Sequence, residues 1–437
     1  MLMRFIDEFY NYATSVDGAK LFRMFWFFFV FEFFRFFLIE ITTLVLWKFT
    51  SFFRKTRIAD ARLTLLEKNP FVSIIVPGKN EGKHIYKLAN SLKEQTYQNF
   101  ELIVIDDGSD DATPEICRSL KKSGYIDTYL RNDVRGGKAS AANLGLRYSR
   151  GQYIIHLDAD CSYDRDAIEN ILVPFYYDLN IGAIGGNVQV RNYKDSLCAT
   201  LQAIEYMDTI SVGRIASSEL GIYRVISGAF GAFKKEALDR LGGWDIGPGL
   251  DGDITVKIRK LGYKIHFEPS AVCQTSVPDT FKKLIKQRLR WDKSLIRFRL
   301  RKHRDVFYPN DSFRWSNFIS FVENITYNLI LNVKWYFYIF DMIINFGSQL
   351  FFILPMNILL YTVNNIIKFL VFSPFRDRKN ETVSYFMIYL PLMVFYFGYF
   401  LRIVRTTAYV QELFFKASYK DNWNPAKSSA HAKALKL

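Results

Sequence analysis

The chain has 437 residues, half of them hydrophobic, and contains 41 phenylalanines. This length suits one catalytic domain with further elements, and the composition is unusual for a soluble protein. The net charge of +15 is concentrated beside apolar stretches, at residues 48–57 and 297–302, which favours membrane edges and disfavours nucleic acid as the partner. The four scattered cysteines form no CxxC pair, so neither a zinc site nor a disulfide framework is expected.

An N-terminal segment, residues 1–23, precedes a nearly unbroken apolar run at residues 24–47. This run has the length that a helix needs to cross a bilayer, so we predict a transmembrane helix. Glu32, Arg35 and Glu40 interrupt it. Glu32 and Arg35 are one turn apart and placed to pair, either as an aid to helix packing or within a transport path. The basic residues that follow place the N-terminus outside and the next domain in the cytosol.

The pattern changes in residues 70–275, where short apolar, β-branched runs alternate with amphipathic helical stretches. Strands are predicted at residues 72–76, 102–105, 153–157 and 183–184. This alternation predicts an α/β domain with a parallel sheet.

The C-terminal third is again apolar. Residues 279–330 contain two predicted amphipathic helices, at 281–300 and 315–325, that we expect at the membrane surface. Residues 335–404 predict two or three transmembrane helices, and residues 405–437 a polar, basic tail. Basic residues at 376–379 and after residue 402 both favour the cytosol, so the number of crossings stays open.

Polar residues follow the predicted strands. Asn80 and Glu81 come after the first strand, and Asp107 of an Asp-Asp-Gly-Ser segment comes after the second. In open α/β sheets, ligands bind beyond the carboxyl ends of strands. A turn or a helix cap would explain the second segment equally well. After the third strand, Asp158 and Asp160 are two residues apart, so both are able to address one divalent cation, with a solvated acidic turn as the alternative.

The ordered set VPGKNE, DDGS, GGK, DAD, SGAFGAF and QRLRW resembles family 2 glycosyltransferases of the membrane polysaccharide-synthase type. Cellulose, chitin, poly-N-acetylglucosamine and hyaluronan synthases belong to this group. The resemblance covers about two-thirds of the chain, and the QxxRW element at Gln287, Arg290 and Trp291 is its most specific part.

The resemblance implies a GT-A-type glycosyltransferase domain, with a Rossmann-like mixed sheet, flanked by transmembrane and interfacial helices. It implies metal-dependent, inverting transfer from a UDP-sugar to a growing polysaccharide, which is passed across the plasma membrane while the catalytic domain faces the cytosol. Accessory subunits are possible further partners. One rival is a non-processive enzyme that adds one sugar to a lipid-linked acceptor, and another is a scaffold with a degenerate catalytic domain.

The resemblance also implies residue roles. The metal, Mg²⁺ or Mn²⁺, is expected on Asp158 and Asp160. The nucleotide-binding residues are expected to be Asn80, Glu81, Asp107, Lys138, Asp158, Gln287, Arg290 and Trp291. The acceptor-binding residues are expected to be Gly228, Phe230, Trp244 and Trp291. Lys138 has a surface lysine as its alternative interpretation, and Trp244 has core packing.

The catalytic base is expected at Asp251 or Asp253, because relatives carry an acidic pair here. Spacing favours Asp251, since Ile254, Thr255 and Gly262 then fall where relatives carry an aliphatic residue, often Thr, and Gly. Asp253 is then a supporting acid. The alternative is that Asp251 only caps the following helix.

Overall fold

The computed structural model describes residues 2–245, 249–372 and 380–420. The chain divides into two compact units. The helical unit comprises Met1–Leu46 and Val322–Thr406, and the sheet unit comprises Trp47–Phe321 and Thr407–Leu437. The sheet unit carries all the residues expected to bind substrate or metal.

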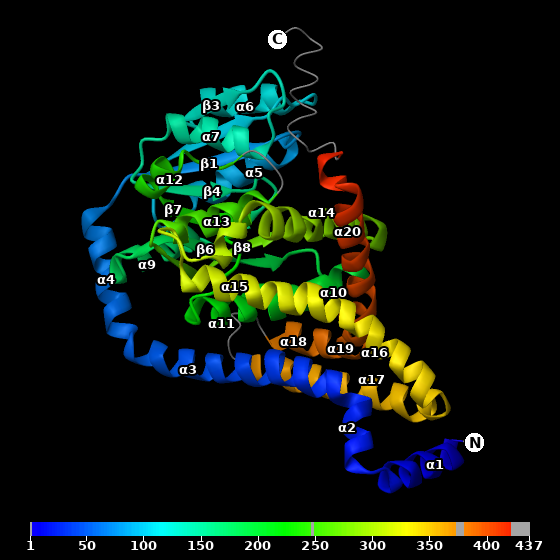
Figure 1. Cartoon of the computed structure of the whole chain (residues 1–437). Helices are drawn as coiled ribbons and strands as arrows, with labels where there is room; N and C mark the ends of the chain where they lie inside the picture. Colours follow the sequence, from blue (N-terminus) through cyan, green and yellow to red (C-terminus); the bar gives the residue numbers. More distant parts are fainter. Residues whose placement is uncertain (1, 246–248, 373–379, 421–437) are drawn as a thin grey trace. The chain divides into compact units, whose positions relative to one another are not determined.

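The sheet unit is built on an eight-stranded sheet with the order β3-β2-β1-β4-β7-β6-β8-β5 (Figure 1). The strands are β1 Val72–Gly78, β2 Phe100–Asp106, β3 Thr128–Arg131, β4 Tyr153–Leu157, β5 Ser162–Tyr163, β6 Ile181–Val190, β7 Phe230–Lys234 and β8 Lys264–Thr275. All four predicted strands are confirmed, as β1, β2, β4 and β6.

The sheet is mixed, as the resemblance implied, and the wholly parallel sheet expected from periodicity is wrong. Strands β1 to β4 run parallel, but β7 pairs antiparallel with both β4 and β6. The apolar pattern of a strand reports its burial and carries no information on its direction. The direction of β7 was therefore beyond the reach of the pattern.

Amphipathic helices cover the sheet. In α5, for example, Ile85, Leu88, Ala89 and Leu92 form one buried stripe at helical spacing. The longer helices of this unit are α4 Lys55–Lys68, α5 Gly82–Lys93, α6 Thr113–Lys122, α7 Lys138–Tyr148, α10 Leu197–Glu205, α13 Leu250–Lys260 and α14 Phe281–Ser294. The shorter ones are α8 Ala167–Leu172, α9 Pro174–Tyr177, α11 Gly213–Glu219 and α12 Lys235–Leu241. Helix α7 packs against β1 and β2, and α8 packs against β8.

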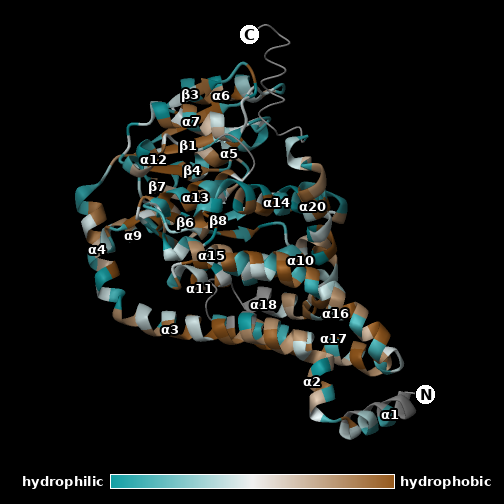
Figure 2. Ribbon diagram, in the orientation of Figure 1, coloured by the Kyte–Doolittle hydropathy of each residue, from teal (hydrophilic) through white to brown (hydrophobic). Residues whose placement is uncertain are grey.

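The helical unit is formed by the two apolar ends of the chain. Its elements include α1 Leu2–Ser15, α2 Gly18–Phe27, η1 Phe28–Ile39, the start of α3 Glu40–Phe53, α16 Leu331–Phe346, α17 Leu350–Phe372, α18 Asn380–Met387, α19 Leu390–Phe395 and most of α20 Leu401–Phe415. Residues 24–47 are helical, as expected. Within the described residues, one helical stretch, Trp315–Val371, is long and apolar enough to cross a membrane. The hydrophobic colouring of α17 in Figure 2 belongs to this stretch.

Three other expectations meet the structure here. The two predicted amphipathic helices are present as α14 with η3 Leu295–Lys302 and as α15 Trp315–Ile325; their position at a membrane stays a prediction. The predicted tail is partly wrong, because residues 405–415 belong to α20, whose apolar residues continue the helix. The basic loop at 376–379 lies outside the described residues.

The charges of the predicted N-terminal span are paired between helices. Arg35 contacts Glu323 at 2.6 Å and Glu40 at 3.4 Å. Glu32 lies 3.6 Å from Arg402. These ion pairs stabilise charges in apolar surroundings, and they fit the packing interpretation.

Candidate active site

The carboxyl ends of the parallel strands form one edge of the sheet, where two predicted loops are joined. Gly78 at the end of β1 pairs in register with Asp106 at the end of β2. Beyond them, the Asn80 amide donates to Ser109 Oγ at 2.9 Å, and the Asp110 amide donates to Asn80 Oδ1 at 3.1 Å. Asn80 has a φ of 62°, a left-handed conformation that asparagine tolerates better than most residues. Asn80 therefore fixes the floor of this edge.

Asp107 is buried at this edge and organises the loop before α7. Its carboxylate accepts hydrogen bonds from Asn132 Nδ2 at 3.0 Å, from Gly136 N at 2.9 Å and from Gly137 N at 2.8 Å. Gly137 has a φ of 89°, which glycine adopts without strain. These bonds set the start of α7, where Lys138 is the first residue.

Three carboxylates gather at the same edge. Asp158 and Asp160 follow β4, and Glu81 precedes α5. Burial, followed by the charges of Asp160 and Asp158, raises the pKa of Glu81 to about 7. Burial and the charge of Asp158 likewise raise the pKa of Asp160. Like charges in a partly desolvated place destabilise one another, so this cluster favours a bound cation.

Lys138 supplies one positive charge to this cluster. Its ammonium group pairs with Asp158 Oδ1. Desolvation opposes the charged form of Lys138, but the carboxylates of Asp158 and Asp251 outweigh it and raise the pKa of the lysine. The expectation that Lys138 belongs to the site is thus supported by its contacts, against the alternative of a surface lysine.

Asp251 lies on the other side of Lys138, in the first turn of α13. Its Oδ2 accepts a hydrogen bond from the Gly228 amide at 2.9 Å. A Cβ on Gly228 would lie 2.7 Å from Asp251 Oδ1 and 3.1 Å from Lys138 Nζ, so the three residues meet with no room between them. Burial raises the pKa of Asp251. Lys138 therefore connects the Asp158 carboxylate with the Asp251 carboxylate.

Asp253 points away from this meeting point. Its carboxylate contacts Lys302 at 2.6 Å and His303 at 2.7 Å. Burial opposes ionisation, but hydrogen bonds from His303 and Lys302 lower the pKa of Asp253 to about 2. A carboxylate so strongly held as an anion is a poor proton acceptor near neutral pH. Of the two acidic residues, Asp251 is the one at the site.

Two of the expected acceptor-binding residues are part of the core. Trp244 is only 3% exposed, and its ring packs against His156 and Phe233. Phe230 is fully buried and packs edge-on against Tyr163. Neither ring offers a free face to a sugar, so the packing interpretation of Trp244 is the one that fits. Of the Ser-Gly-Ala-Phe-Gly segment, Gly228 alone is placed by its contacts against Asp251 and Lys138.

His156 supports the site from within the sheet and was missed by the sequence analysis. Its Nδ1 lies 2.7 Å from the Gly228 carbonyl oxygen. Burial, followed by the charge of Lys138, lowers the pKa of His156 to about 4, so the ring is neutral at pH 7 and donates through Nδ1–H. The available signal was its position in β4, two residues before Asp158 and on the same face.

The QxxRW residues lie on α14. The side chains of Arg290 and Trp291 are exposed, Trp291 by 40%. Arg288, between them and Gln287 in sequence, was also missed. Its guanidinium lies 4.7 Å from the centre of the Trp291 ring and pairs with Glu205 at 2.8 Å. This stacking holds the indole in place.

Comparison with known proteins agrees with this geometry. Residues 73–242 match the family model Glycosyl transferase family 2. The chain carries a family 2 glycosyltransferase domain. The catalytic edge formed by β1, β2 and β4 lies inside the matched range, whereas Asp251 and the QxxRW residues follow it.

Similar curated proteins are poly-beta-1,6-N-acetyl-D-glucosamine synthases. The protein of Staphylococcus epidermidis is 36% identical over 222 residues, which are 50% of this chain and 53% of the relative. That of Staphylococcus aureus is 34% identical over 223 residues, with the same shares. The chain thus spans about half the length of the curated relatives it matches.

A solved structure shares the fold. It is a mannosyltransferase from Pyrobaculum calidifontis in complex with GDP-Man and Mn²⁺, with a TM-score of 0.55 and 21% identity, covering 87% of this chain and 100% of that one. The likeness extends beyond the sheet unit, since 87% of the chain is covered.

The residues present fit a divalent cation. No group of three or more His, Cys, Asp or Glu side chains forms a complete metal cage among the described residues. Mg²⁺, however, is commonly held by one or two carboxylates together with substrate phosphates and water. Asp158 and Asp160 supply such oxygens, and the raised pKa of Asp160 and Glu81 marks excess negative charge there.

Proposed function

We propose that this protein is an inverting polysaccharide synthase that transfers sugar from a UDP-sugar to a growing glycan chain. The observation that carries the proposal is the connection of Asp158 and Asp251 through Lys138 at the carboxyl edge of the sheet. One carboxylate stands at the expected diphosphate position and the other at the expected base position. The named relatives make UDP-N-acetylglucosamine the first donor to test.

In the proposed reaction, Asp251 accepts the proton of an acceptor hydroxyl group. The hydroxyl oxygen forms a bond to the anomeric carbon, while the bond from that carbon to the diphosphate oxygen breaks on the opposite face. The anomeric configuration is thereby inverted, and UDP leaves with the electron pair. The Gly228 amide orients Asp251, and the Lys138 ammonium group stabilises negative charge on the leaving diphosphate.

Asp158 and Asp160 would hold Mg²⁺ or Mn²⁺. When bound, such an ion neutralises the charge of diphosphate oxygens. The donor nucleotide is proposed to contact Asn80, Glu81 and Asp107 on the sheet side. Arg290 is proposed to bind the diphosphate, because a guanidinium group suits phosphate oxygens, with Gln287 beside it. Trp291 would then meet the acceptor end.

The membrane part of the proposal concerns the helical unit. We infer that residues 24–47 and the stretch Trp315–Val371 cross the plasma membrane, with the sheet unit in the cytosol. The apolar length of Trp315–Val371 and the basic residues that follow residue 47 support this. The growing glycan would pass outward through the helical unit.

The test uses the full chain in purified membranes with each nucleotide sugar in turn. We expect release of UDP and a polymer that a β-1,6-N-acetylglucosaminidase degrades, with activity lost in excess EDTA and restored by Mg²⁺ or Mn²⁺. The matched control is Asp158→Asn, which should be inactive at any metal concentration. A product with a single added sugar would instead identify a non-processive transferase, and full turnover in EDTA would contradict the metal requirement.

A further inference from the structure

The two acidic residues of α13 contact different parts of the protein. Successive residues of an α-helix are rotated by about 100°, so side chains two positions apart point to nearly opposite sides. Asp251 accordingly contacts Gly228 at the proposed site. Asp253 contacts Lys302 and His303 at the end of η3. The helix that begins beside the proposed base is therefore fixed on its other side by charge.

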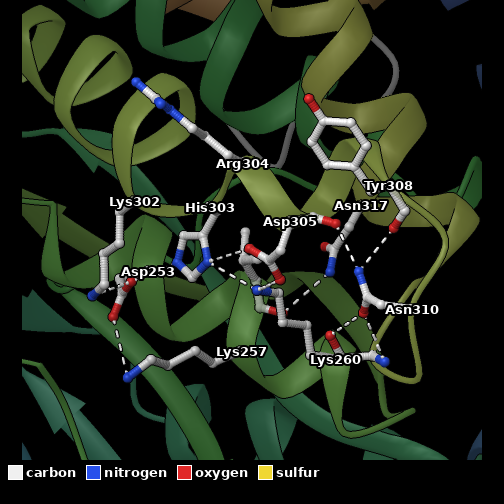
Figure 3. A network of polar contacts seen from close by, with 12 residues as sticks. Asp253, Lys257, Lys260, Lys302, His303, Arg304, Asp305, Tyr308, Asn310 and Asn317 are labelled. Carbon is white, nitrogen blue, oxygen red and sulfur yellow. Dashed lines mark hydrogen bonds and ion pairs between the residues drawn. The ribbon is translucent and has the colours of Figure 1, made fainter.

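This second set of contacts is a closed network of ion pairs (Figure 3). Lys302 Nζ lies 2.6 Å from Asp253 Oδ1 and also 2.6 Å from Asp245 Oδ2. Lys257, one turn along α13, contacts Asp245 at 2.5 Å and Asp253 at 3.6 Å. The Asp253 side chain is only 6% exposed. We call Asp253, Lys302 and His303, with Lys257 and Asp245, the α13 clasp.

The hydrogen bonds of His303 determine its tautomer. Its Nδ1 lies 3.1 Å from Lys260 Nζ, and its Nε2 lies 2.7 Å from Asp253 Oδ1. Lys260 is held as a cation by an ion pair with Asp305. Because an ammonium group only donates, Nδ1 must accept, and Nε2–H must donate to Asp253. His303 thus gives a directed bond that only one ring orientation satisfies.

The clasp acts on the first turn of α13, because the rest of the helix has its own anchors. Toward its C-terminal end, Arg259 donates to the Tyr223 carbonyl, and Asn317 Nδ2 donates to the Val256 carbonyl at 3.2 Å. At the N-terminal end, a Cβ on Gly252 would lie 3.2 Å from the Phe298 ring. Close packing against η3 together with the clasp therefore sets the position of the turn that carries Asp251.

The clasp also reaches the QxxRW helix. Element η3 continues α14 without a break, because Leu295, the cap residue of α14, has right-handed helical dihedrals. Lys302 and His303 stand about three turns beyond Trp291 on this one helical rod. A displacement at the clasp would therefore change the position of Asp251 relative to Arg290 and Trp291.

We propose that Asp253 and His303 are positioning residues, which hold the base Asp251 at a fixed place relative to the helix that carries Arg290 and Trp291. This inference rests on the proposed function. The clasp sets the alignment of acceptor and donor, and it takes no part in proton transfer. Its loss reduces sugar transfer to the glycan acceptor more than binding or slow hydrolysis of the donor, because water needs no alignment with α13.

The experiment compares the variants Asp253→Asn, His303→Ala and His303→Gln in the full chain. For each, UDP release is measured with and without the glycan acceptor. We expect Asp253→Asn and His303→Ala to lower kcat for transfer about tenfold or more, with the KM for the donor and the rate of hydrolysis within about twofold of wild type. His303→Gln should recover part of the loss, since its amide keeps a donor near the Nε2 position.

The matched control is Glu101→Gln. Glu101 is also a buried carboxylate, paired with Arg150 at 2.8 Å, but it stands near the start of β2, away from the carboxyl edge. This variant should lose stability without a change in the ratio of transfer to hydrolysis. The double variant Asp253→Asn/His303→Ala should be no worse than either single variant, because both break one contact.

The outcomes separate the two proposals. A wild-type chain that transfers no sugar would overturn the proposed function. Wild-type transfer with an unchanged ratio in Asp253→Asn and His303→Ala would overturn the clasp alone. Failure of all three variants to fold, judged by thermal melting, would also overturn it, since the clasp would then be only structural. If Asp253→Asn alone fails to fold, the partly exposed Lys302 allows a milder break, and Lys302→Met should change the ratio in the same direction.

Discussion

At the residue scale, Asp251 and Asp253 show how one helix gives two aspartates different chemistry. Burial beside Gly228 raises the pKa of Asp251. Hydrogen bonds from His303 and Lys302 lower the pKa of Asp253 to about 2, against the effect of burial. A general base benefits from a pKa closer to the working pH, whereas a carboxylate in an ion network does not take protons there.

The first prediction concerns Asp251→Asn. We expect turnover to fall about a hundredfold or more with UDP binding retained, because the amide cannot accept the proton. In the wild type, a raised pKa means that the base becomes protonated at a higher pH than an ordinary aspartate, so activity should decline on the acid side already above pH 4. Steady-state rates from pH 4 to 8, with UDP binding by calorimetry, check this. Near-wild-type turnover of Asp251→Asn would show that another group is the base.

At the element scale, the site depends on how closely β4, α7, α13 and the loop before β7 approach one another. Gly228 is the point of contact. Its carbonyl accepts from His156 at 2.7 Å and its amide donates to Asp251 at 2.9 Å. A strand, a loop and a helix start are thereby joined through one peptide unit that has no side chain.

The second prediction is that Gly228→Ala displaces Asp251 and Lys138. The added methyl group would lie within 2.7 Å of Asp251 Oδ1, nearer than a carbon and an oxygen tolerate. We expect activity to fall about tenfold to a hundredfold with the melting temperature nearly unchanged, because the side chains are able to move aside. Gly398→Ala is the control, since nothing lies within 4 Å of its added Cβ. Equal activity of both variants would contradict the close approach.

At the scale of the whole molecule, the chain combines a sheet unit that carries the site with a helical unit made from both apolar ends of the sequence. The four cysteines are free and buried within the sheet unit, as expected for reduced thiols. They leave the protein surface open to labelling through an introduced thiol.

The third prediction is that the sheet unit faces the cytosol. Ser109 is buried and bonded to Asn80, whereas Ser123 is exposed, so Ser123→Cys gives the better probe. An impermeant maleimide should leave this variant unlabelled in intact cells and label it after permeabilisation. Wild-type protein, with only buried thiols, is the control. Labelling in intact cells would place the unit outside.

The sequence alone determined the strands β1, β2, β4 and β6, the polar residues at their ends and the helical character of residues 24–47. These features are local, because burial, periodicity and chain direction place neighbouring residues together. The ordered motifs also indicated the family before any contact was known.

Only the tertiary structure decided which of these residues meet. The antiparallel direction of β7, the burial of Trp244 and Phe230, and the partners of Arg35 depend on segments far apart in sequence. His156, Arg288 and the contacts of Asp253 with Lys302 and His303 carry no local signal of their role. Their positions follow from packing across the sheet and between helices, which no pattern within a single segment contains.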